Sequence, residues 1–329
     1  MDGSSWEPGG LSHGGEAEAS GGEQTVSAMM SVDGFTFDTL IGYDEEIARI
    51  RDLGILEGPD PEFVRFIEQM QQQHGLYNEP SGDFVLFHSS AREDADRLML
   101  AVANELDRPT IRMRLVSGPD GRQALCIMTT QSVGLEGFKD WGTLVLEGVD
   151  TWGAPDAPNM DLPYGEMLSS GMPNAAFKAI SLIRSAISNP KVTVLASAYT
   201  GYVEASPMLN TLGPITAFEV PLPSDAERDA IWDFLMDKHV SMSALDRVEL
   251  VSLSRGMPRG DIFSAAREAV TRAYNESIER RRYIPVSRGN LLDKIAAYQP
   301  LESDEYRQIE DSAVEDLLGE IERYERGEL

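Results

Sequence analysis

Short apolar runs alternate with segments of helical periodicity along the middle of the chain. Each run is rich in apolar or β-branched residues and is bounded by turn residues, as buried strands of a parallel sheet are. Such strands are predicted at Phe84–His88, Thr110–Val116, Thr143–Glu147, Val192–Ser197 and Ala217–Leu222. Helices are predicted over Asp44–Leu53, Pro61–His74, Ala175–Ser188 and a longer region from Asp225 to Asn275. This alternation favours an α/β fold with a doubly wound parallel sheet.

The two ends of the chain differ from this middle part. Residues 1–33 contain Gly, Ser and Glu with few large apolar groups, which predicts a disordered acidic tail. Residues 34–223 form the predicted α/β core, and residues 224–300 form a smaller all-α domain. Residues 301–329 are rich in carboxylates but keep apolar residues at helical intervals. We therefore expect an acidic amphipathic helix there, packed on the body or on a partner.

The net charge of the chain narrows the classes of partner. The formal charge is -27 at pH 7, and so acidic a surface is repelled by nucleic-acid phosphates and by anionic lipid headgroups. We expect no nucleic-acid or membrane binding; the acidity either keeps the protein soluble or serves to dock a protein partner with a basic surface. No apolar run is long enough to cross a membrane, which predicts a cytoplasmic location. The single cysteine and the scattered histidines indicate neither a disulfide framework nor a metal site.

Five separated segments, taken in order, resemble the AAA branch of the P-loop ATPases. They are FTFDTLIGYDEEIARIRDL from Phe35, AVANEL from Ala101, LVLEGVD from Leu144, EVPLP from Glu219 and SRGMPRGDIFSAAREA from Ser254. The resemblance covers roughly residues 35–300. It implies a P-loop NTPase-like sheet of about five strands with a helical carboxyl-terminal lid and, in intact family members, hydrolysis of Mg-ATP.

The turn after the first predicted strand lies where the resemblance places the phosphate-binding loop. There the family carries glycines, which let backbone amides approach the phosphates, and a lysine that neutralises them. The turn in this chain contains neither a glycine nor a lysine. Asp94 falls on the lysine position when the count starts from the strand, and Ala95 does when it starts from the helix. The degenerate loop positions are Ser89, Ser90, Arg92, Asp94, Ala95 and Asp96.

Acidic side chains at the start of this helix replace the missing cation. Glu93, Asp94 and Asp96 would face bound phosphates, and one such repulsion at about 4 Å costs roughly 4 kcal/mol at an effective dielectric near 20. That cost weakens binding by about a thousandfold. Ser90 and Glu93 also have the spacing of a capping box, so we expect the helix to satisfy its own first amides.

The positions that serve hydrolysis in the family have changed as well. At the acidic strand end, Glu147 falls on the magnesium-binding position and Gly148 on the position of the water-activating glutamate. Asp150 matches a further acidic residue of that motif. Tyr199 falls where the family has a polar sensor at the end of its fourth strand. The group that would activate the attacking water is therefore missing.

Two features by which family members act on neighbours or substrates are also missing. Asn210 and Gly213 stand where two arginines would reach into the neighbouring subunit's nucleotide. Between Val116 and Thr143, the family has a pore-facing loop and a long helix. Here a Gly/Pro turn is followed by ALCIMTTQSV, which is more typical of a strand. Threading of a peptide substrate therefore loses support.

Two hypotheses follow from these losses. The first is a noncatalytic, AAA-like pseudo-ATPase without a cofactor, which acts as a regulatory or protein-binding subunit. Its partner would be an intact AAA ATPase, in a mixed oligomer, or a protein with a basic surface. The second hypothesis is an ATPase with a divergent site, in which Glu147 binds magnesium and Arg92 or Arg97 binds phosphate. The first assigns no catalytic residue, and Glu147 is a metal ligand only under the second.

Overall fold

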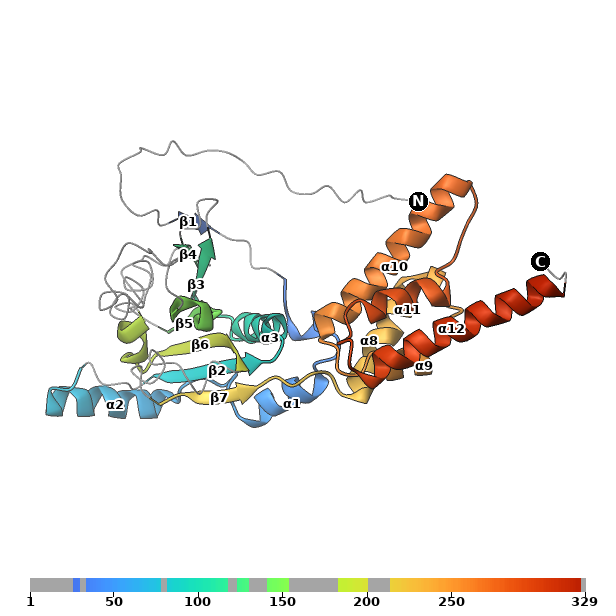
Figure 1. Cartoon of the computed structure of the whole chain (residues 1–329). Coiled ribbons are helices and arrows are strands. Elements are labelled where there is room, and N and C mark those ends of the chain that lie inside the picture. The colour runs from blue at the N-terminus through green and yellow to red at the C-terminus, as the bar shows by residue number, and fades with distance from the viewer. Residues whose placement is uncertain are drawn as a thin grey trace, which may run out of the picture.

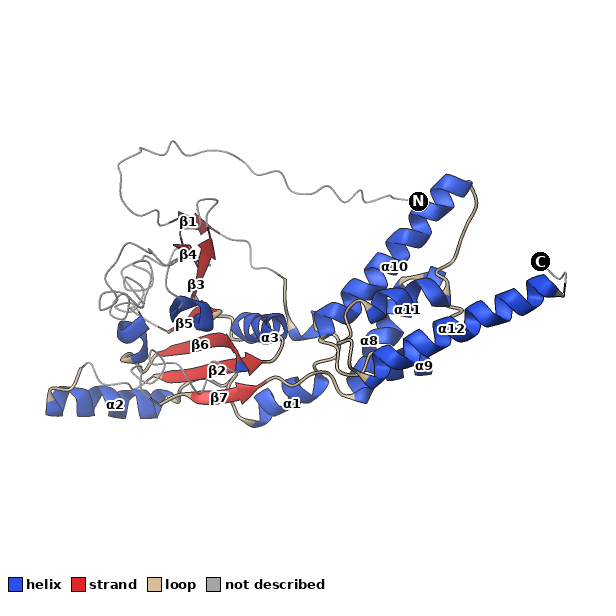
Figure 2. Ribbon diagram, in the orientation of Figure 1, coloured by secondary structure: helices blue, strands red, loops and turns tan. Residues whose placement is uncertain are grey.

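The computed structural model of the chain describes residues 26–29, 34–77, 82–117, 123–129, 141–153, 183–200 and 214–326 (Figure 1). These residues form a mostly parallel sheet flanked by helices, followed by a group of helices on the carboxyl-terminal side (Figure 2). The predicted α/β class is confirmed. In the described part of the chain, no helix combines the length and the apolar character that a membrane span requires.

The sheet has seven strands in the order β1-β4-β3-β5-β6-β2-β7. Their bounds are Val26–Met29 (β1), Asp83–Ser89 (β2), Thr110–Ser117 (β3), Gln123–Thr129 (β4), Gly142–Glu147 (β5), Val192–Tyr199 (β6) and Thr216–Glu219 (β7). The five strands predicted from apolar runs are confirmed as β2, β3, β5, β6 and β7. Neighbours among these five pair in parallel.

Two further strands extend the sheet at the β3 edge. β4 forms over the strand-like stretch noted in the sequence and pairs with β3 in antiparallel fashion. β1 pairs in parallel with β4, from Val26 opposite Cys126 to Met29 opposite Thr129. β1 lies in the segment predicted to be disordered, and Val26–Met29 differ from that prediction. Four residues can pair with an exposed strand edge through their backbone alone, without large apolar side chains.

Strand side chains alternate between two apolar layers, one on each face of the sheet. In β2, Phe84 and Leu86 belong to one layer, and Val85 and Phe87 belong to the other. α3 (Arg92–Glu105) covers the second layer and lies against β2, β5 and β6, while the helical residues 183–187 cover the first. Because both faces are covered, the strands appear in the sequence as continuous apolar runs.

Two helices precede β2, as predicted. α1 (Asp44–Asp52) follows the short 3-10 turn η1 (Phe37–Thr39) and contributes Ile47 and Ile50 to the layer beneath α3. α2 (Pro61–His74) starts with proline at its first position and with the Asp60 carboxylate accepting the Glu62 N–H. Gly75, in the left-handed conformation, ends it.

The carboxyl-terminal helices build a core of their own. They are α8 (Asp225–Lys238), α9 (Arg247–Leu253), α10 (Arg259–Arg280), α11 (Arg288–Ala296) and α12 (Asp304–Glu325). Two 3-10 turns, η2 (Val149–Gly153) and η3 (Val240–Met242), follow β5 and α8. Trp232 is buried in this core, and its indole N–H donates to the Ser254 hydroxyl at 2.9 Å. α12, which forms over the acidic carboxyl-terminal segment, packs against α9 and α11.

Candidate functional site

The carboxyl ends of the parallel strands form the edge at which a ligand site is expected. In a doubly wound sheet, that site lies where successive connections leave a starting strand toward opposite sides. β2 is this strand, because β6, β5 and β3 lie on one side of it and β7 lies on the other. The loop after β2 and the first turn of α3 lie at this edge, and they carry the degenerate loop positions Ser89 to Asp96.

The start of α3 differs from the sequence prediction. The residue that precedes the helix is Ala91, and no side chain caps the helix there. The hydroxyl of the buried Ser89 accepts the Ala91 N–H at 3.1 Å, and Glu93 pairs one turn along the helix with Arg97. The predicted capping box of Ser90 and Glu93 is therefore wrong. β2 continues in register with β6 as far as Ser89, so the helix begins one residue later than that box requires.

Asp94 and Ala95, the two candidates for the lysine position, are both fully buried but face different surroundings. Ala95 packs in the apolar layer beneath α3. Asp94 faces the helical part of the chain: its Oδ2 accepts from Nη1 and from the backbone N–H of Arg259, each at 3.3 Å. The Tyr43 hydroxyl donates to its Oδ1, also at 3.3 Å. The Asp94 carboxylate is thus engaged by side chains from outside its own helix.

Arg259, the first residue of α10, is the centre of this contact, and its side chain is fully buried. Its guanidinium donates to Glu46 at 3.1 Å and to Glu227 at 2.9 Å, in addition to Asp94. It also donates to the backbone carbonyls of Gly42 and Pro221, and it lies 4.2 Å from the centre of the Tyr43 ring. We call Tyr43, Glu46, Asp94, Glu227 and Arg259 the arginine cluster. It joins the helical part to the sheet part of the chain.

Little in the sequence indicates this role for Arg259. It belongs to an Arg-Gly-Asp triplet within the last of the five AAA-like segments. An arginine at the start of a helix carries no sequence signal of burial, since its partners come from segments far apart in the chain. The one available sign was indirect: carboxylates at Glu46 and Asp94 interrupt otherwise amphipathic helices on sides that prove to be buried.

Burial raises the pKa of two carboxyl groups in the arginine cluster. The pKa of Glu46 is raised to about 7 by burial, followed by its hydrogen bond with Glu227. Burial likewise raises the pKa of Asp94. Burial opposes the charge of Arg259, but Glu46 and its other acidic neighbours outweigh that effect and raise its pKa. One guanidinium thus faces three buried carboxyl groups, and protonation of Glu46 reduces the excess negative charge.

A second group of polar residues lies between α3 and the end of β5. The Ser197 hydroxyl donates to Asp96 and accepts the Gly148 N–H at 2.9 Å. The pKa of Asp96 is raised to about 6, chiefly by burial, partly offset by the Ser197 hydrogen bond and reinforced by nearby carboxylates. Asp150 pairs with Arg92 at the first position of α3. Four of the predicted site positions, Arg92, Asp96, Gly148 and Asp150, therefore meet here, in contact with one another or with Ser197.

Glu147 and Tyr199 occupy the ends of their strands. Glu147 is bound by Arg112 of β3 through two hydrogen bonds, one of them 2.8 Å long. Tyr199 lies beside Ser89 in the sheet, and 47% of its surface is exposed. Among the described residues, no three His, Cys, Asp or Glu side chains are placed to hold a metal ion together. The predicted positions Asn210 and Gly213 lie outside the described residues.

Four arginines around this edge pair with carboxylates of the same chain. Arg92 pairs with Asp150, Arg97 with Glu93, Arg112 with Glu147, and Arg259 with Asp94, Glu46 and Glu227. A phosphate group would have to displace these carboxylates to reach the guanidinium groups, and it would meet their negative charge in doing so. These four guanidinium groups are thus already neutralised by carboxylates of the chain itself.

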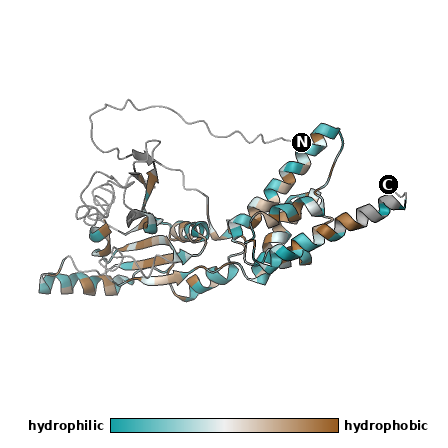
Figure 3. Cartoon of the chain, in the orientation of Figure 1, coloured by the Kyte–Doolittle hydropathy of each residue, from teal (hydrophilic) through white to brown (hydrophobic). Residues whose placement is uncertain are grey.

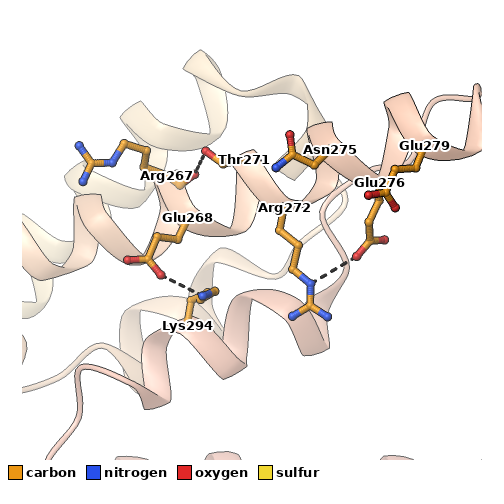
Figure 4. A pocket seen from close by; sticks show the side chains of 8 residues that line it. All are labelled: Arg267, Glu268, Thr271, Arg272, Asn275, Glu276, Glu279 and Lys294. Atoms are coloured by element: carbon orange, nitrogen blue, oxygen red, sulfur yellow. Dashed lines mark hydrogen bonds and ion pairs between the residues drawn. The ribbon is translucent and has the colours of Figure 1, made fainter.

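A surface hollow of about 440 Å³ lies elsewhere, along α10 and α11 (Figure 4). Its walls carry charges of both signs. Lys294 of α11 points toward Glu268 of α10, at 2.9 Å, and Arg272 pairs with Glu276 one turn further along α10 (Figure 4). Lined by such exposed charges, the hollow is better suited to contact a polar macromolecular surface than to enclose a small apolar ligand.

Comparison with known proteins adds no assignment to these observations. No protein-family model matches the chain, and no curated protein matches it. The function is therefore inferred from the residues and their geometry alone.

Proposed function

We propose that the protein is a noncatalytic, AAA-like module, a pseudo-ATPase that acts as a regulatory or protein-binding subunit. The observation that carries the proposal is the buried pair of Asp94 and Arg259. In a working phosphate-binding loop, the helix start and its lysine hold an anion supplied by the nucleotide. In this chain, the carboxylate of Asp94 supplies the negative charge, and it comes from the protein itself.

The surroundings of this pair support the proposal. Mg-ATP does not fit the residues present, because Asp94 stands where a cation is needed and Gly148 provides no water-activating carboxylate. Glu147, the remaining candidate for magnesium, is bound by Arg112. A nucleotide would have to break ion pairs that are already formed, and separating a buried pair is costly because it leaves a charge uncompensated.

A fixed connection between the two parts of the chain suits a binding role. In a nucleotide-driven machine, the helical part moves relative to the sheet part as the ligand changes. Here Arg259 and its three carboxylates, all buried, join the two parts directly. The protein would therefore present a fixed acidic surface to a basic protein, or to an intact AAA ATPase as a passive member of a mixed oligomer.

Thermal unfolding with and without millimolar Mg-ATP tests the proposal. We expect an unchanged melting temperature and phosphate release no faster than in a sample without protein. A ligand at about 100 times its dissociation constant would stabilise the fold by about 2.7 kcal/mol. A clear upward shift that is lost in the Glu147→Gln variant, together with phosphate release, would establish the divergent ATPase instead. Exposed Glu62→Gln on α2 is the matched control substitution.

A further inference from the structure

The far end of α10 carries an apolar and basic surface that the fold leaves exposed. Tyr274 and Ile278 lie one helical turn apart and are 64% and 63% exposed. After Glu279, Arg280, Arg281 and Arg282 follow, all of them exposed. No other place in the sequence has two consecutive Lys or Arg residues. On a chain with a net charge of -27, such a cluster is a local reversal of sign. We call these five residues the basic tip.

The far end of α12 has the opposite character. Val314, Leu317 and Leu318 are spaced three and four residues apart, so they lie on one side of the helix, and each is more than half exposed. The exposed carboxylates of Glu310, Asp311 and Glu315 accompany this stripe. Figure 3 shows brown residues on this part of α12. We call these six residues the acidic stripe.

The acidic stripe does not cover the basic tip of its own chain. α12 is held to the helical core up to Ser312, whose hydroxyl accepts a hydrogen bond from Arg288 at 2.7 Å. Beyond that point α12 projects from the helical part, as the far end of α10 also does, and the two ends stand apart (Figure 1). Two helical surfaces of complementary charge, each with an apolar row, are thus both presented outward.

We propose that these surfaces bind each other between two copies of the chain, the acidic stripe of one copy packing on the basic tip of the other. In a two-fold dimer, the acidic stripe of each copy would pack on the basic tip of the other. The same contact is then made twice, and no stripe or tip is left to bind a third copy. The surface hollow of Figure 4 extends along α10 toward the basic tip, since Asn275 and Glu279 line it. Thr271 and Asn275, which line it, are three residues before Tyr274 and Ile278 on the same helix. It gives the incoming helix a concave seat.

Complementary charge reversal tests this pairing in the full-length chain. The first variant, Arg280→Glu/Arg281→Glu/Arg282→Glu, makes the tip acidic. The second, Glu310→Lys/Asp311→Lys/Glu315→Lys, makes the stripe basic. In a dimer of either variant alone, the stripe and the tip that meet carry the same sign of charge. In a mixed dimer of the two variants, the stripe and the tip carry opposite charges at both contacts. Sedimentation velocity over a concentration series measures the association. The control Arg65→Glu/Lys238→Glu/Arg255→Glu makes the same change in net charge as the first variant, but at exposed positions elsewhere.

We expect the wild type to dimerise with an affinity that falls at high salt. Each variant alone should dimerise at least about tenfold more weakly, because several exposed ion pairs become repulsions. The equimolar mixture should recover the wild-type affinity, and the control should retain it. A monomeric wild type at low salt would overturn the proposal, as would variants that dimerise like the wild type or a mixture that fails to recover. This pairing does not rest on the proposed function, since nucleotide binding and dimerisation are measured separately.

Discussion

Asp94 of α3 and Arg259 of α10 lie 165 positions apart in the sequence, and their Oδ2 and Nη1 atoms are 3.3 Å apart in the interior. Both side chains are fully buried. The pair therefore fixes the first turn of α3, at the edge where a ligand is expected, against the first turn of α10 in the helical part. It links the turn after β2 to the arrangement of the two parts of the chain.

Replacing Arg259 by methionine should destabilise the fold strongly. The substitution keeps much of the buried side-chain volume but leaves Asp94, Glu46 and Glu227 without their cation. Removing one partner of a buried ion pair typically costs about 3–5 kcal/mol. Urea unfolding at neutral pH measures the loss.

Arg247→Met is the matched control, because Arg247 pairs with Asp229 and Asp233 at the surface. Exposed pairs contribute about 0–1 kcal/mol. Similar losses in the two variants would show that the arginine cluster is not a structural connection between the two parts of the chain.

Glu46→Gln should change how stability depends on pH. The folded-state pKa of Glu46, about 7, lies above its ordinary value of 4.5 because of burial. Its contribution to the free energy of unfolding is therefore fully present below about pH 4.5 and is lost as the pH rises through about 7. Glutamine resembles the protonated acid and does not titrate. The variant should gain stability relative to the wild type across this window, by up to about 3 kcal/mol.

Urea unfolding of both proteins at several pH values between 4.5 and 8 provides the comparison. The difference between the two proteins is the relevant quantity, because the many other carboxylates titrate equally in both. A difference that stays constant with pH, or that favours the wild type more at high pH, would contradict a raised pKa of Glu46 in the folded protein.

Asp96→Asn should also gain stability relative to the wild type as the pH rises, but over a lower range of pH. Burial, together with Glu147 and Asp150, raises the pKa of Asp96 to about 6 from 3.8, despite the hydrogen bond from Ser197. The wild type loses the corresponding stability as the pH rises from about 4 to 6. Asparagine can still accept the Ser197 hydrogen bond without a charge. At pH 7.5 the variant should be more stable by on the order of 1–2 kcal/mol, and the gain should vanish near pH 4.

Melting temperatures at these two pH values suffice for the measurement, with Asp52→Asn as the control on the exposed side of α1. If the Asp96 variant is less stable at both pH values, the carboxylate is held in its charged form by its hydrogen bond, and the assignment of a raised pKa is wrong.

The strands could be predicted because a strand that is buried on both faces consists of consecutive apolar residues, and such a run is visible in the sequence. β2 shows this, since Phe84 to Phe87 alternate between two layers and are all apolar. β1 has no such apolar run, because it is only four residues long and depends on backbone pairing with β4. The start of α3 was misplaced because Ser90 and Glu93 have capping-box spacing, whereas the continuation of β2 to Ser89 is decided by pairing with Tyr199.

The candidate site was predicted position by position but not as an arrangement. The resemblance left Asp94 and Ala95 as alternatives for the lysine position, and the carboxylate of Asp94 was expected to offset the positive end of its own helix. The structure instead directs that carboxylate to Arg259 and Tyr43. Partners such as these come from segments that meet only in the folded chain, so neither spacing nor periodicity identifies them. Glu147 likewise appeared suited to a metal, whereas its pairing with Arg112 depends on the neighbouring strand β3.

Gly42→Ala should separate backbone strain from packing at the contact between the two parts of the chain. Gly42 and Gly256 have nearly the same left-handed conformation, with φ of +78° and +80°. In either case an alanine there costs about 1–2 kcal/mol of backbone strain. A Cβ on Gly256 meets nothing within 4 Å, but a Cβ on Gly42 would lie 2.6 Å from Cδ1 of the buried Ile231 in α8.

Overpacking of a filled core costs about 1–3 kcal/mol beyond the strain. Gly42→Ala should therefore be less stable than Gly256→Ala by that amount when both are unfolded in urea. Because the clash lies between the segment before α1 and the helical part, it should also loosen that contact, which limited proteolysis would detect as earlier cleavage in the Gly42 variant. Equal stability of the two variants would mean that Ile231 moves aside freely and that the two parts of the chain are packed together more loosely than their buried contacts indicate.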